Sequence, residues 1–334
     1  MAFDLADRRG EVGGAYQHIY SGLTLQSPAR YTALPGLKLK HPREYITVPE
    51  YRAYLEKYAA HHGLQPRRAE ITGIVRSDRS FVVQFGVEPG RRYAAVAVAT
   101  GMYDSPIWPA IPGLARQNEG VIHARVWTGP SDFTGKRMLV LGGATSAVEI
   151  AAECATHGLP IVMSTRSGVK VSSPRFLGRD VHDYAHIASH LLPRWLAGPY
   201  CEHRPTLPGS DLGFTRLQRE GKIEVFGPVK RFDGKTAIFP DGRREKFDVV
   251  IAATGYRFEM PFLPTEVIRT PAGHPLADDG ESRAWPGLFF IGVPCCRTLV
   301  SEFLRGIAKD APAIAERIAN RSQESGVRSQ GIHV

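Results

Sequence analysis

The strongest constraint on the fold of this chain is the segment of residues 136–152, KRMLVLGGATSAVEIAA. Its short apolar run, stopped by two glycines, is typical of a buried strand in a parallel sheet. The alanine-rich stretch that follows predicts a helix. The glycine turn between them would bring unpaired backbone N–H groups and the positive end of a helix dipole to one point, which attracts phosphate. The segment therefore predicts the strand, turn and helix of a dinucleotide site.

The turn departs from the usual fingerprint in one position. Dinucleotide turns follow G-x-G-x-x-G/A, and the chain reads GGATSA. Gly142 matches the first position and Ala147 is allowed at the last, but Ala144 stands where the backbone should approach a pyrophosphate. The hydroxyl of Ser146 can touch phosphate or simply cap the helix, and capping needs no ligand. The motif alone leaves open a dinucleotide site or a βα turn without a ligand.

The end of the next expected strand indicates which nucleotide would bind. Residues 160–165 form a second apolar run, which ends at Arg166. In a Rossmann unit an acid at this place holds a free ribose 2′-OH, whereas an arginine suits a 2′-phosphate. Arg166 therefore favours NADP over NAD. An ordinary surface arginine is the alternative.

Length and composition limit the class of protein. A chain of 334 residues predicts two globular units, and 43% apolar with 22% charged residues is typical of soluble proteins. No apolar run approaches the ~20 residues that span a bilayer, and the charged start does not resemble a signal peptide. The net charge of +9 comes from scattered side chains without interleaved aromatics. We therefore expect no nucleic-acid partner and no membrane span.

The four cysteines, Cys154, Cys201, Cys295 and Cys296, show neither metal-binding nor CxxC spacing. This pattern favours a protein of the reducing cytoplasm. We expect the adjacent Cys295 and Cys296 to serve as small apolar residues.

Three histidines recur every four residues, at His182, His186 and His190. On a helix they would form a stripe, but the third drifts round the axis and no glutamate completes a zinc motif. We expect a polar face at a cleft or subunit contact, and no metal.

The rest of the chain divides into short elements. A helix is expected at 48–61 and a small meander of three strands at 70–76, 81–85 and 93–99, with a turn at 87–91. A proline-rich linker ends near residue 113. Beyond the nucleotide turn we expect an insertion at 168–215, a hairpin at 222–240, strands at 247–253 and 288–291, and a terminal helix at 298–319.

Several further motifs resemble one family. They are GGAY at 13–16, LTLQSPARYTALPG at 23–36, ATG at 99–101, FDVVIAATGY at 247–256, and the segments 286–292 and 303–306. Together they are similar to the flavin-dependent monooxygenases of the flavin-containing and Baeyer–Villiger type, and the similarity covers nearly the whole chain.

The resemblance implies an α/β fold with two Rossmann-like dinucleotide-binding domains. A discontinuous FAD-binding-like domain would comprise residues 1–113 and 246–334, and an NADP-binding domain at 114–245 would be inserted in it. Family members begin with a strand, a G-x-G-x-x-G turn and a helix that hold the FAD pyrophosphate, and this sequence starts at what resembles the second strand. We therefore expect a truncated FAD domain, either because the true start is missing or because FAD binds poorly or not at all.

The function implied by the resemblance is an NADPH-dependent flavoprotein monooxygenase. It would use FAD and NADPH to insert one oxygen atom of O2 into a small substrate at a nitrogen, sulfur or carbonyl centre, in the cytoplasm. Homo-oligomer formation stays open. The alternatives are an FAD/NADPH oxidoreductase without oxygenation, and a nucleotide-binding pseudoenzyme or partner subunit that lost FAD.

The family fingerprint F-x-G-x-x-x-H-x-x-x-(W/Y) is matched in part. His123 and Trp127 keep their spacing, which gives them a catalytic role by resemblance, but Gly120 is displaced by one residue and Gln117 replaces the phenylalanine. A structural histidine at a domain junction is the alternative for His123. The resemblance places Asp7, Gly13, Gly14, Tyr16, Thr100 and Gly292 at FAD, and Gly142, Ser146 and Arg166 at NADPH. Further cofactor-binding residues are Gly101, Gly143, Thr145, Thr254 and Gly255.

Overall fold

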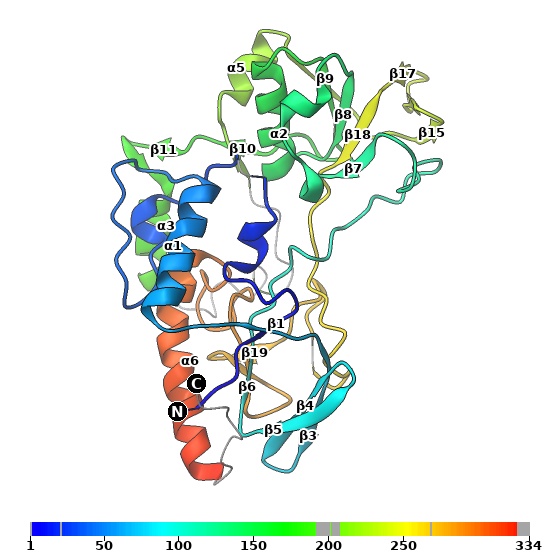
Figure 1. Ribbon diagram of the computed structural model, residues 1–334. Helices are drawn as coiled ribbons and strands as arrows, with labels where there is room; N and C mark the ends of the chain where they lie inside the picture. Colours follow the sequence, from blue (N-terminus) through cyan, green and yellow to red (C-terminus); the bar gives the residue numbers. More distant parts are fainter. Residues whose placement is uncertain (1, 21, 192–200, 202–207, 268, 326–334) are drawn as a thin grey trace.

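The computed structural model describes residues 2–20, 22–191, 201, 208–267 and 269–325. Two lobes are visible in Figure 1. The upper lobe holds a parallel sheet with its helices and a small antiparallel sheet beside it, and the lower lobe holds further small sheets and a long terminal helix. The structure thus has mixed α/β architecture with a Rossmann-type sheet.

The core of the upper lobe is a five-stranded parallel sheet. Its order is β14 (Ile223–Phe226), β9 (Ile161–Ser164), β8 (Met138–Leu141), β18 (Val249–Ala252) and β7 (Val121–His123). Every residue of β8, β9 and β18 is buried, as continuous apolar runs predict. Helix α2 (Thr145–Thr156) packs on this sheet through its small residues, and α5 (Phe214–Arg219) packs beside α2.

The position of β18 differs from the expected division of the chain. The sequence predicts that residues from 246 onward return to the first unit, but Ile251 pairs with Val140 of β8 and with Ile122 of β7. A run of buried apolar residues suits the centre of either sheet, so its composition cannot say which one it joins. Hydrogen bonds place this strand in the upper lobe.

The lower lobe contains separate small sheets. The strands β3 (Ile71–Ser77), β4 (Ser80–Phe85) and β5 (Glu88–Tyr93) are antiparallel. A second sheet runs β19 (Ala277–Asp278), β20 (Glu281–Ser282), β21 (Leu288–Phe290) and β6 (Val96–Val98), with β6 parallel to β21. The short strands β1 (Ala6–Asp7) and β2 (Arg67–Arg68) form a third. No strand within the described residues joins β1 to β6 or β21.

The predicted meander is therefore right for two strands and wrong for the third. Residues 87–91 are predicted as a turn but lie largely in β5, and the predicted third strand supplies β6 of another sheet. Gly86, at a φ of 56°, completes a tight turn after β4. Because β5 is a mostly exposed edge strand, its residues lack the apolar alternation that marks a strand.

The lower lobe contains two long helices, one above the other on its left side in Figure 1. The predicted helix 48–61 is confirmed as α1 (Val48–His61), whose Glu50 carboxylate accepts hydrogen bonds from the backbone N–H and the hydroxyl of Thr47. The terminal helix α6 (Leu304–Ser325) begins later than the predicted 298, because Ser301 Oγ accepts the N–H groups of Arg297 and Thr298 in a loop.

The insertion consists of short pieces. It contains β10 (Val171–Ser172), β11 (Arg175–Phe176), β12 (Arg179–Asp180), α3 (Val181–Leu191) and β13 (Gly209–Ser210). The hairpin expected at 222–240 is only partly right, since β14 joins the parallel sheet. The strands β15 (Arg231–Asp233), β16 (Thr236–Ile238) and β17 (Arg244–Lys246) make a separate antiparallel sheet.

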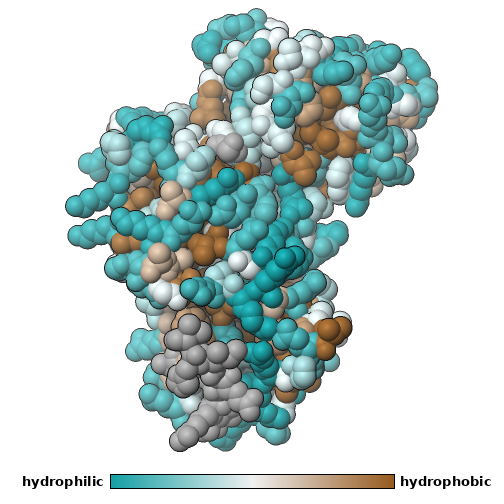
Figure 2. All heavy atoms as spheres, viewed as in Figure 1, coloured by the Kyte–Doolittle hydropathy of each residue, from teal (hydrophilic) through white to brown (hydrophobic). Residues whose placement is uncertain are grey.

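The visible surface is mostly hydrophilic, with apolar side chains in scattered groups (Figure 2). Among the helices that the structure describes, none is both long and apolar enough to cross a bilayer.

The central place of β18 can be tested by truncating one side chain. Ile251 is fully buried, so Ile251→Ala should lower the free energy of unfolding by ~3 kcal/mol. Val75, on β3, is 55% exposed, and Val75→Ala should change stability by less than ~0.5 kcal/mol. Urea unfolding followed by circular dichroism measures both. Equal losses would contradict the placement of β18 at the centre of a buried sheet.

Candidate functional site

The predicted nucleotide-binding turn, residues 142–144 and here called the nucleotide turn, lies at the carboxyl edge of the parallel sheet. After β8 the chain turns at Gly142 and Gly143 and enters α2 at Thr145. The neighbours at this edge are Arg166, two residues after the end of β9, and Thr254, two residues after the end of β18. Since the chain continues from β8 to β9 on one side and meets β18 on the other, this edge has the crevice at which open parallel sheets bind ligands.

Close contacts explain the two glycines of the turn. Gly142 has a φ of 147°, and a Cβ there would lie 2.4 Å from the carbonyl oxygen of Ala253. A Cβ on Gly143 would lie 2.5 Å from the carbonyl oxygen of Gly168. The turn is therefore fixed between the end of β18 and the start of the insertion, and Lys170 N–H donates to the carbonyl of Gly143 at 2.7 Å.

The start of α2 suits a phosphate. In the described part of the chain no side chain caps this helix, and its first turn carries no acid. The helix has 12 residues, so its N-terminal N–H groups and its dipole favour an anion, and Gly209 of the insertion packs against Thr145 on one side of this end. Arg166 is exposed beyond the end of β9, and Ser146 and Thr145 lie in the first turn.

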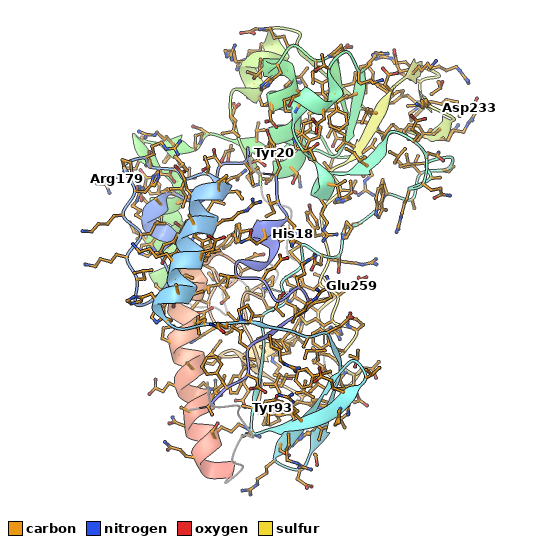
Figure 3. The ribbon with its side chains drawn as sticks, in the orientation of Figure 1. His18, Tyr20, Tyr93, Arg179, Asp233 and Glu259 are labelled. Atoms are coloured by element: carbon orange, nitrogen blue, oxygen red, sulfur yellow. A yellow bond between two sulfur atoms is a disulfide. The ribbon has the colours of Figure 1, made fainter. Side chains whose placement is uncertain are left out.

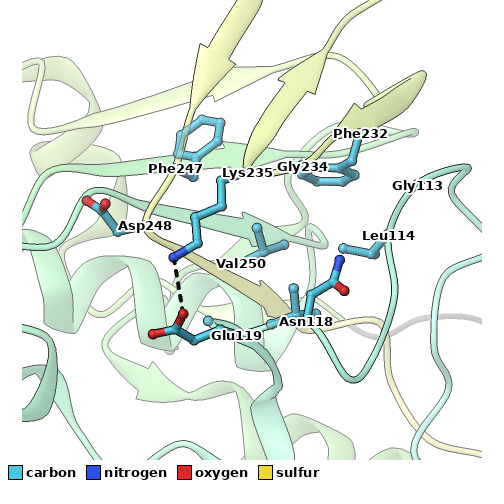
Figure 4. A pocket seen from close by; sticks show the side chains of 12 residues that line it. Gly113, Leu114, Asn118, Glu119, Phe232, Gly234, Lys235, Phe247, Asp248 and Val250 are labelled. Carbon is cyan, nitrogen blue, oxygen red and sulfur yellow. Dashed lines mark ion pairs between the residues drawn. The ribbon is translucent and has the colours of Figure 1, made fainter.

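A separate cavity of about 280 Å³ lies at the opposite edge of the same sheet (Figure 4). It is lined by Gly120 and Asp248, which precede β7 and β18, and by Lys235, whose ammonium lies 3.9 Å from the Glu119 carboxylate. Amino ends of parallel strands are not where nucleotides bind. This cavity is therefore distinct from the nucleotide turn.

Two connecting segments run together between the lobes: the proline-rich segment after the first ATG motif, and the segment that follows β18 and contains the second ATG motif. Ile107 N–H donates to the carbonyl of Gly255 at 2.9 Å, and Arg257 N–H donates to the carbonyl of Ser105 at 3.0 Å. The hydroxyl of Thr254 also donates to the carbonyl of Ile107. The structure thus brings the proline-rich segment after the first ATG motif against the second ATG motif.

His123 lies against these connecting segments. Its ring lies 5.5 Å from that of Trp108 and 5.2 Å from that of Tyr256, and its Nδ1 accepts the N–H of Arg125 at 3.0 Å. Burial lowers the pKa of His123 to about 4, although the backbone groups of Gly255 and Ile107 favour the charged ring. The ring is therefore neutral at neutral pH.

Trp127 does not lie with His123. It is 5% exposed, stacks on Phe133 with ring centroids 5.0 Å apart, and donates from its indole N–H to Glu153 at 3.1 Å. The hydroxyl of Tyr20 donates to the same carboxylate at 2.5 Å, and Figure 3 places Tyr20 between the lobes. Trp127 thus packs in the core of the upper lobe.

The residues expected at FAD lie at two places in the lower lobe. Thr100 and Gly101 follow β6, and Gly292 follows the parallel strand β21, so the two strand ends meet at one edge. The N–H of Ile291 donates to the carbonyl of Val98 at 3.0 Å, which fixes their register.

Asp7 ends β1, in a separate sheet. Its carboxylate accepts the N–H groups of Arg9 at 2.7 Å and Gly10 at 2.9 Å. Gly13 and Gly14 both have positive φ and lead into the short η1 helix (Gly14–Gln17), where the Tyr16 ring meets Tyr51 at 4.9 Å. Desolvation raises the pKa of Tyr16, so its hydroxyl stays protonated.

Two polar clusters escape prediction from the sequence. Asp104 pairs with Arg8, Arg9 and Arg125, and these contacts connect the segment after β1 to the segment after β7. The carboxylates of Glu149 and Glu153, one turn apart on α2, face the N-terminal segment. Their spacing of four residues on a predicted helix indicates that the two side chains share a face, but no sequence pattern identifies the residues they contact.

The expectation of four reduced cysteines is wrong for two of them. Cys201 and Cys295 form a disulfide, while Cys154 and Cys296 are buried thiols. The two sulfurs come from segments 94 residues apart, so spacing cannot reveal the pair. In the described residues no three His, Cys, Asp or Glu side chains gather as metal ligands, and the side chain of His190 lies outside them.

Comparisons with known proteins agree with this geometry. A family model described as pyridine nucleotide-disulphide oxidoreductase matches residues 26–177, and one described as flavin-binding monooxygenase-like matches residues 214–274. The chain is 28% identical to a probable indole-3-pyruvate monooxygenase, YUCCA8, of Arabidopsis thaliana, over 96% of this chain and 84% of that protein.

Solved structures show the same fold. A flavin-containing monooxygenase from Stenotrophomonas maltophilia superposes with a TM-score of 0.74 at 22% identity, covering 95% of this chain and 91% of that one. A bacillithiol disulfide reductase from Bacillus cereus superposes with a TM-score of 0.69 at 19% identity, covering 94% and 90%.

These findings define a nucleotide-dependent flavoprotein oxidoreductase. The chain is similar over nearly its whole length to flavin-dependent monooxygenases, and two family models of flavin- and pyridine-nucleotide-dependent oxidoreductases match parts of it. The families described by these models imply a flavin and a pyridine nucleotide as cofactors.

The carboxyl of Glu149 on α2 has a raised pKa. Burial raises the pKa of this carboxyl to about 7, with Glu153 adding to the rise and the amide of Gln26, 2.6 Å away, opposing it. The folded protein then holds a proton that the unfolded chain releases near pH 4.5, so the free energy of unfolding falls as pH rises from about 4.5 to about 7. Glu149→Gln should remove this loss, worth up to ~2 kcal/mol after allowance for partial exposure.

Chemical unfolding at pH 5 and pH 8 measures the effect. Glu224→Gln, on exposed β14 surface, is the matched control and should leave the pH dependence of the wild type unchanged. A Glu149→Gln protein with the same pH dependence as wild type would disprove the buried, protonated carboxyl.

Proposed function

We propose that this protein is an FAD-containing, NADPH-dependent monooxygenase. It would insert one oxygen atom of O2 into a small substrate at a nitrogen, sulfur or carbonyl centre. The observation that carries the proposal is the arrangement of two candidate nucleotide-binding edges around one pair of connecting segments. The α2 turn lies on one side of these segments, and the ends of β6 and β21 lie on the other.

The NADPH side is supported by three features. The uncapped start of α2 suits the pyrophosphate, Ser146 adds a hydroxyl donor, and Arg166 suits the 2′-phosphate. Ala144 has extended backbone, with a φ of −117°, which a residue with a Cβ adopts without strain. Gly142 and Gly143 would shape the cradle, and Thr145 would start the helix.

The FAD side fits in part. Asp7 would bind the ribose, and Gly13, Gly14 and Tyr16 would flank the nucleotide. Thr100, Gly101 and Gly292 would border the ring system, with Thr254 and Gly255 reaching it from the connecting segments. In the described residues β6 is the edge strand of its sheet, and no strand followed by a glycine turn and helix pairs with it to hold the pyrophosphate. When bound, the flavin would accept hydride from NADPH and activate O2.

The chain's own residues would orient the cofactors and exclude water. His123 is neutral and contacts the rings of Trp108 and Tyr256. It would provide an uncharged packing contact between the upper lobe and the connecting segments. Trp127 would act indirectly, by fixing the segment after His123 to Glu153 of α2.

The domain division remains part of the proposal. An FAD-binding-like unit would comprise residues 1–113 and the chain after the second ATG motif, and the NADP-binding unit would span 114–245 together with β18. A cytoplasmic location is also proposed.

A reductase without oxygenation is the second candidate. Gly120 and Gln117 depart from the monooxygenase fingerprint, and the bacillithiol disulfide reductase has a similar fold. Such an enzyme would oxidise NADPH without placing oxygen in a substrate. The partial flavin cradle keeps a non-catalytic nucleotide-binding subunit as a third outcome.

The experiment that tests the proposal is the visible spectrum of the purified chain, followed by turnover. We expect a flavin spectrum, directly or after reconstitution with FAD. We also expect that an amine, sulfide or ketone stimulates NADPH oxidation and is converted to an oxygenated product. Flavin reduction without oxygenated product for any of the three substrate classes would select the reductase. A colourless chain that takes up no FAD would overturn both enzyme proposals.

Cofactor choice gives a sharper prediction. Arg166→Ala should raise the KM or Kd for NADPH by about tenfold, equal to ~1.4 kcal/mol, because a charge-assisted contact to the 2′-phosphate is lost. The value for NADH should change by less than about twofold. Arg219→Ala, an exposed arginine in the last turn of α5, is the matched control. Equal effects of Arg166→Ala on NADPH and NADH would rule out the phosphate contact.

A further inference from the structure

The Cys201–Cys295 disulfide joins the insertion to the loop between β21 and α6. This loop includes Gly292, two residues after the end of β21, at the edge where the flavin would lie. The bond is thus a covalent connection between the insertion and a predicted cofactor-contacting loop.

Noncovalent contacts hold the same loop on its other sides. The N–H of Gly280 donates to the carbonyl of Cys296 at 2.7 Å, and Ser301 Oγ accepts the N–H groups of Arg297 at 3.2 Å and Thr298 at 2.8 Å. The Arg297 guanidinium lies 3.0 Å from the Asp279 carboxylate. The loop is therefore fixed at defined points whose hydrogen bonds can be followed individually.

The backbone of Cys295 is in an unfavourable conformation. Its φ is 50°, in the left-handed region, and its side chain is buried. For a residue with a Cβ this conformation is disfavoured by roughly five- to thirtyfold relative to glycine, and it persists only where surrounding contacts impose it. The bond to Cys201 is one of these restraints.

We propose that the Cys201–Cys295 disulfide is a thiol–disulfide switch that holds the loop after β21 in its flavin-facing conformation. In the oxidised protein the bond to Cys201 keeps Cys295 at positive φ. In the reduced protein Cys295 relaxes to negative φ, and the hydrogen bonds around residues 296–301 loosen. The statement that the loop faces a flavin rests on the proposed function, whereas the switch itself does not.

The chemistry of the switch requires an external dithiol. Reduction breaks the Cys201 Sγ–Cys295 Sγ bond and adds two electrons and two protons, giving two thiols, while the dithiol becomes a cyclic disulfide. Reoxidation reverses these changes. The buried thiol of Cys296, next to Cys295, is not consumed in either direction.

The state of the cysteines is measured first. Protein purified without reductant should, after denaturation, alkylate at two cysteines, Cys154 and Cys296, and at all four after treatment with dithiothreitol. Peptide mapping by mass spectrometry identifies the sites. Four reactive thiols before reduction would overturn the proposal.

The movement of the loop is measured by amide hydrogen exchange on the chain without added cofactor. The N–H groups of Gly280, Arg297 and Thr298 should exchange at least fivefold faster after reduction. Cys201→Ala should show this fast exchange without reductant, because it removes the bond and leaves the unfavourable φ at residue 295.

Cys295→Gly separates the bond from the backbone. Glycine adopts the left-handed conformation without cost, so this variant should keep slow exchange in both redox states despite lacking the bond. Cys154→Ala removes a buried sulfur of the upper lobe and should respond to reduction like the wild type. Unchanged exchange in reduced wild type, or equally fast exchange in Cys295→Gly and Cys201→Ala, would overturn the switch.

A final measurement relates the loop to the flavin. Reduction and Cys201→Ala should each weaken FAD binding by about fivefold, measured by fluorescence of added FAD, whereas Cys295→Gly should not. If neither the oxidised nor the reduced protein binds FAD, the proposed function is refuted, and the thiol and exchange results alone decide whether the switch exists. FAD affinity that is equal in all these forms would overturn its flavin-facing role.

Discussion

The pairing of β18 between β8 and β7 is the interaction on which the rest of the structure depends. It buries a strand whose every residue is apolar and brings its end against the nucleotide turn. From that end the chain passes directly into Thr254 and Gly255, which bond to the proline-rich segment below. A single strand thus aligns the nucleotide turn, the connecting segments and His123.

The sequence predicts those parts that are local. The run before Gly142 and the helix 48–61 are confirmed because burial on both faces, helical spacing and end signals all lie within a few residues. The membership of β18, the edge strand β5 and the Cys201–Cys295 bond are decided by partners far along the chain. Composition does not specify such partners.

The same distinction applies to the candidate site. The glycine turn and the ATG motifs are visible in the sequence because each requires particular residues at fixed spacing. Asp104, with its three arginines, and the carboxylates of Glu149 and Glu153 are ordinary charged residues in the sequence. Their contacts across the lobes arise only when distant segments meet. Trp127 shows the reverse case, since its motif spacing is kept while its ring packs in the core.

The contact of Gly142 with the carbonyl of Ala253 also limits how the chain can vary. With 2.4 Å between that oxygen and the place of a Cβ, any side chain at residue 142 must displace the end of β18. That displacement would move Thr254 and Gly255, and with them the path between the lobes. Substitutions that alter this turn must therefore be matched by changes in the second ATG motif. Under the proposed function, a change of nucleotide preference is better sought at the exposed Arg166 than at the glycines.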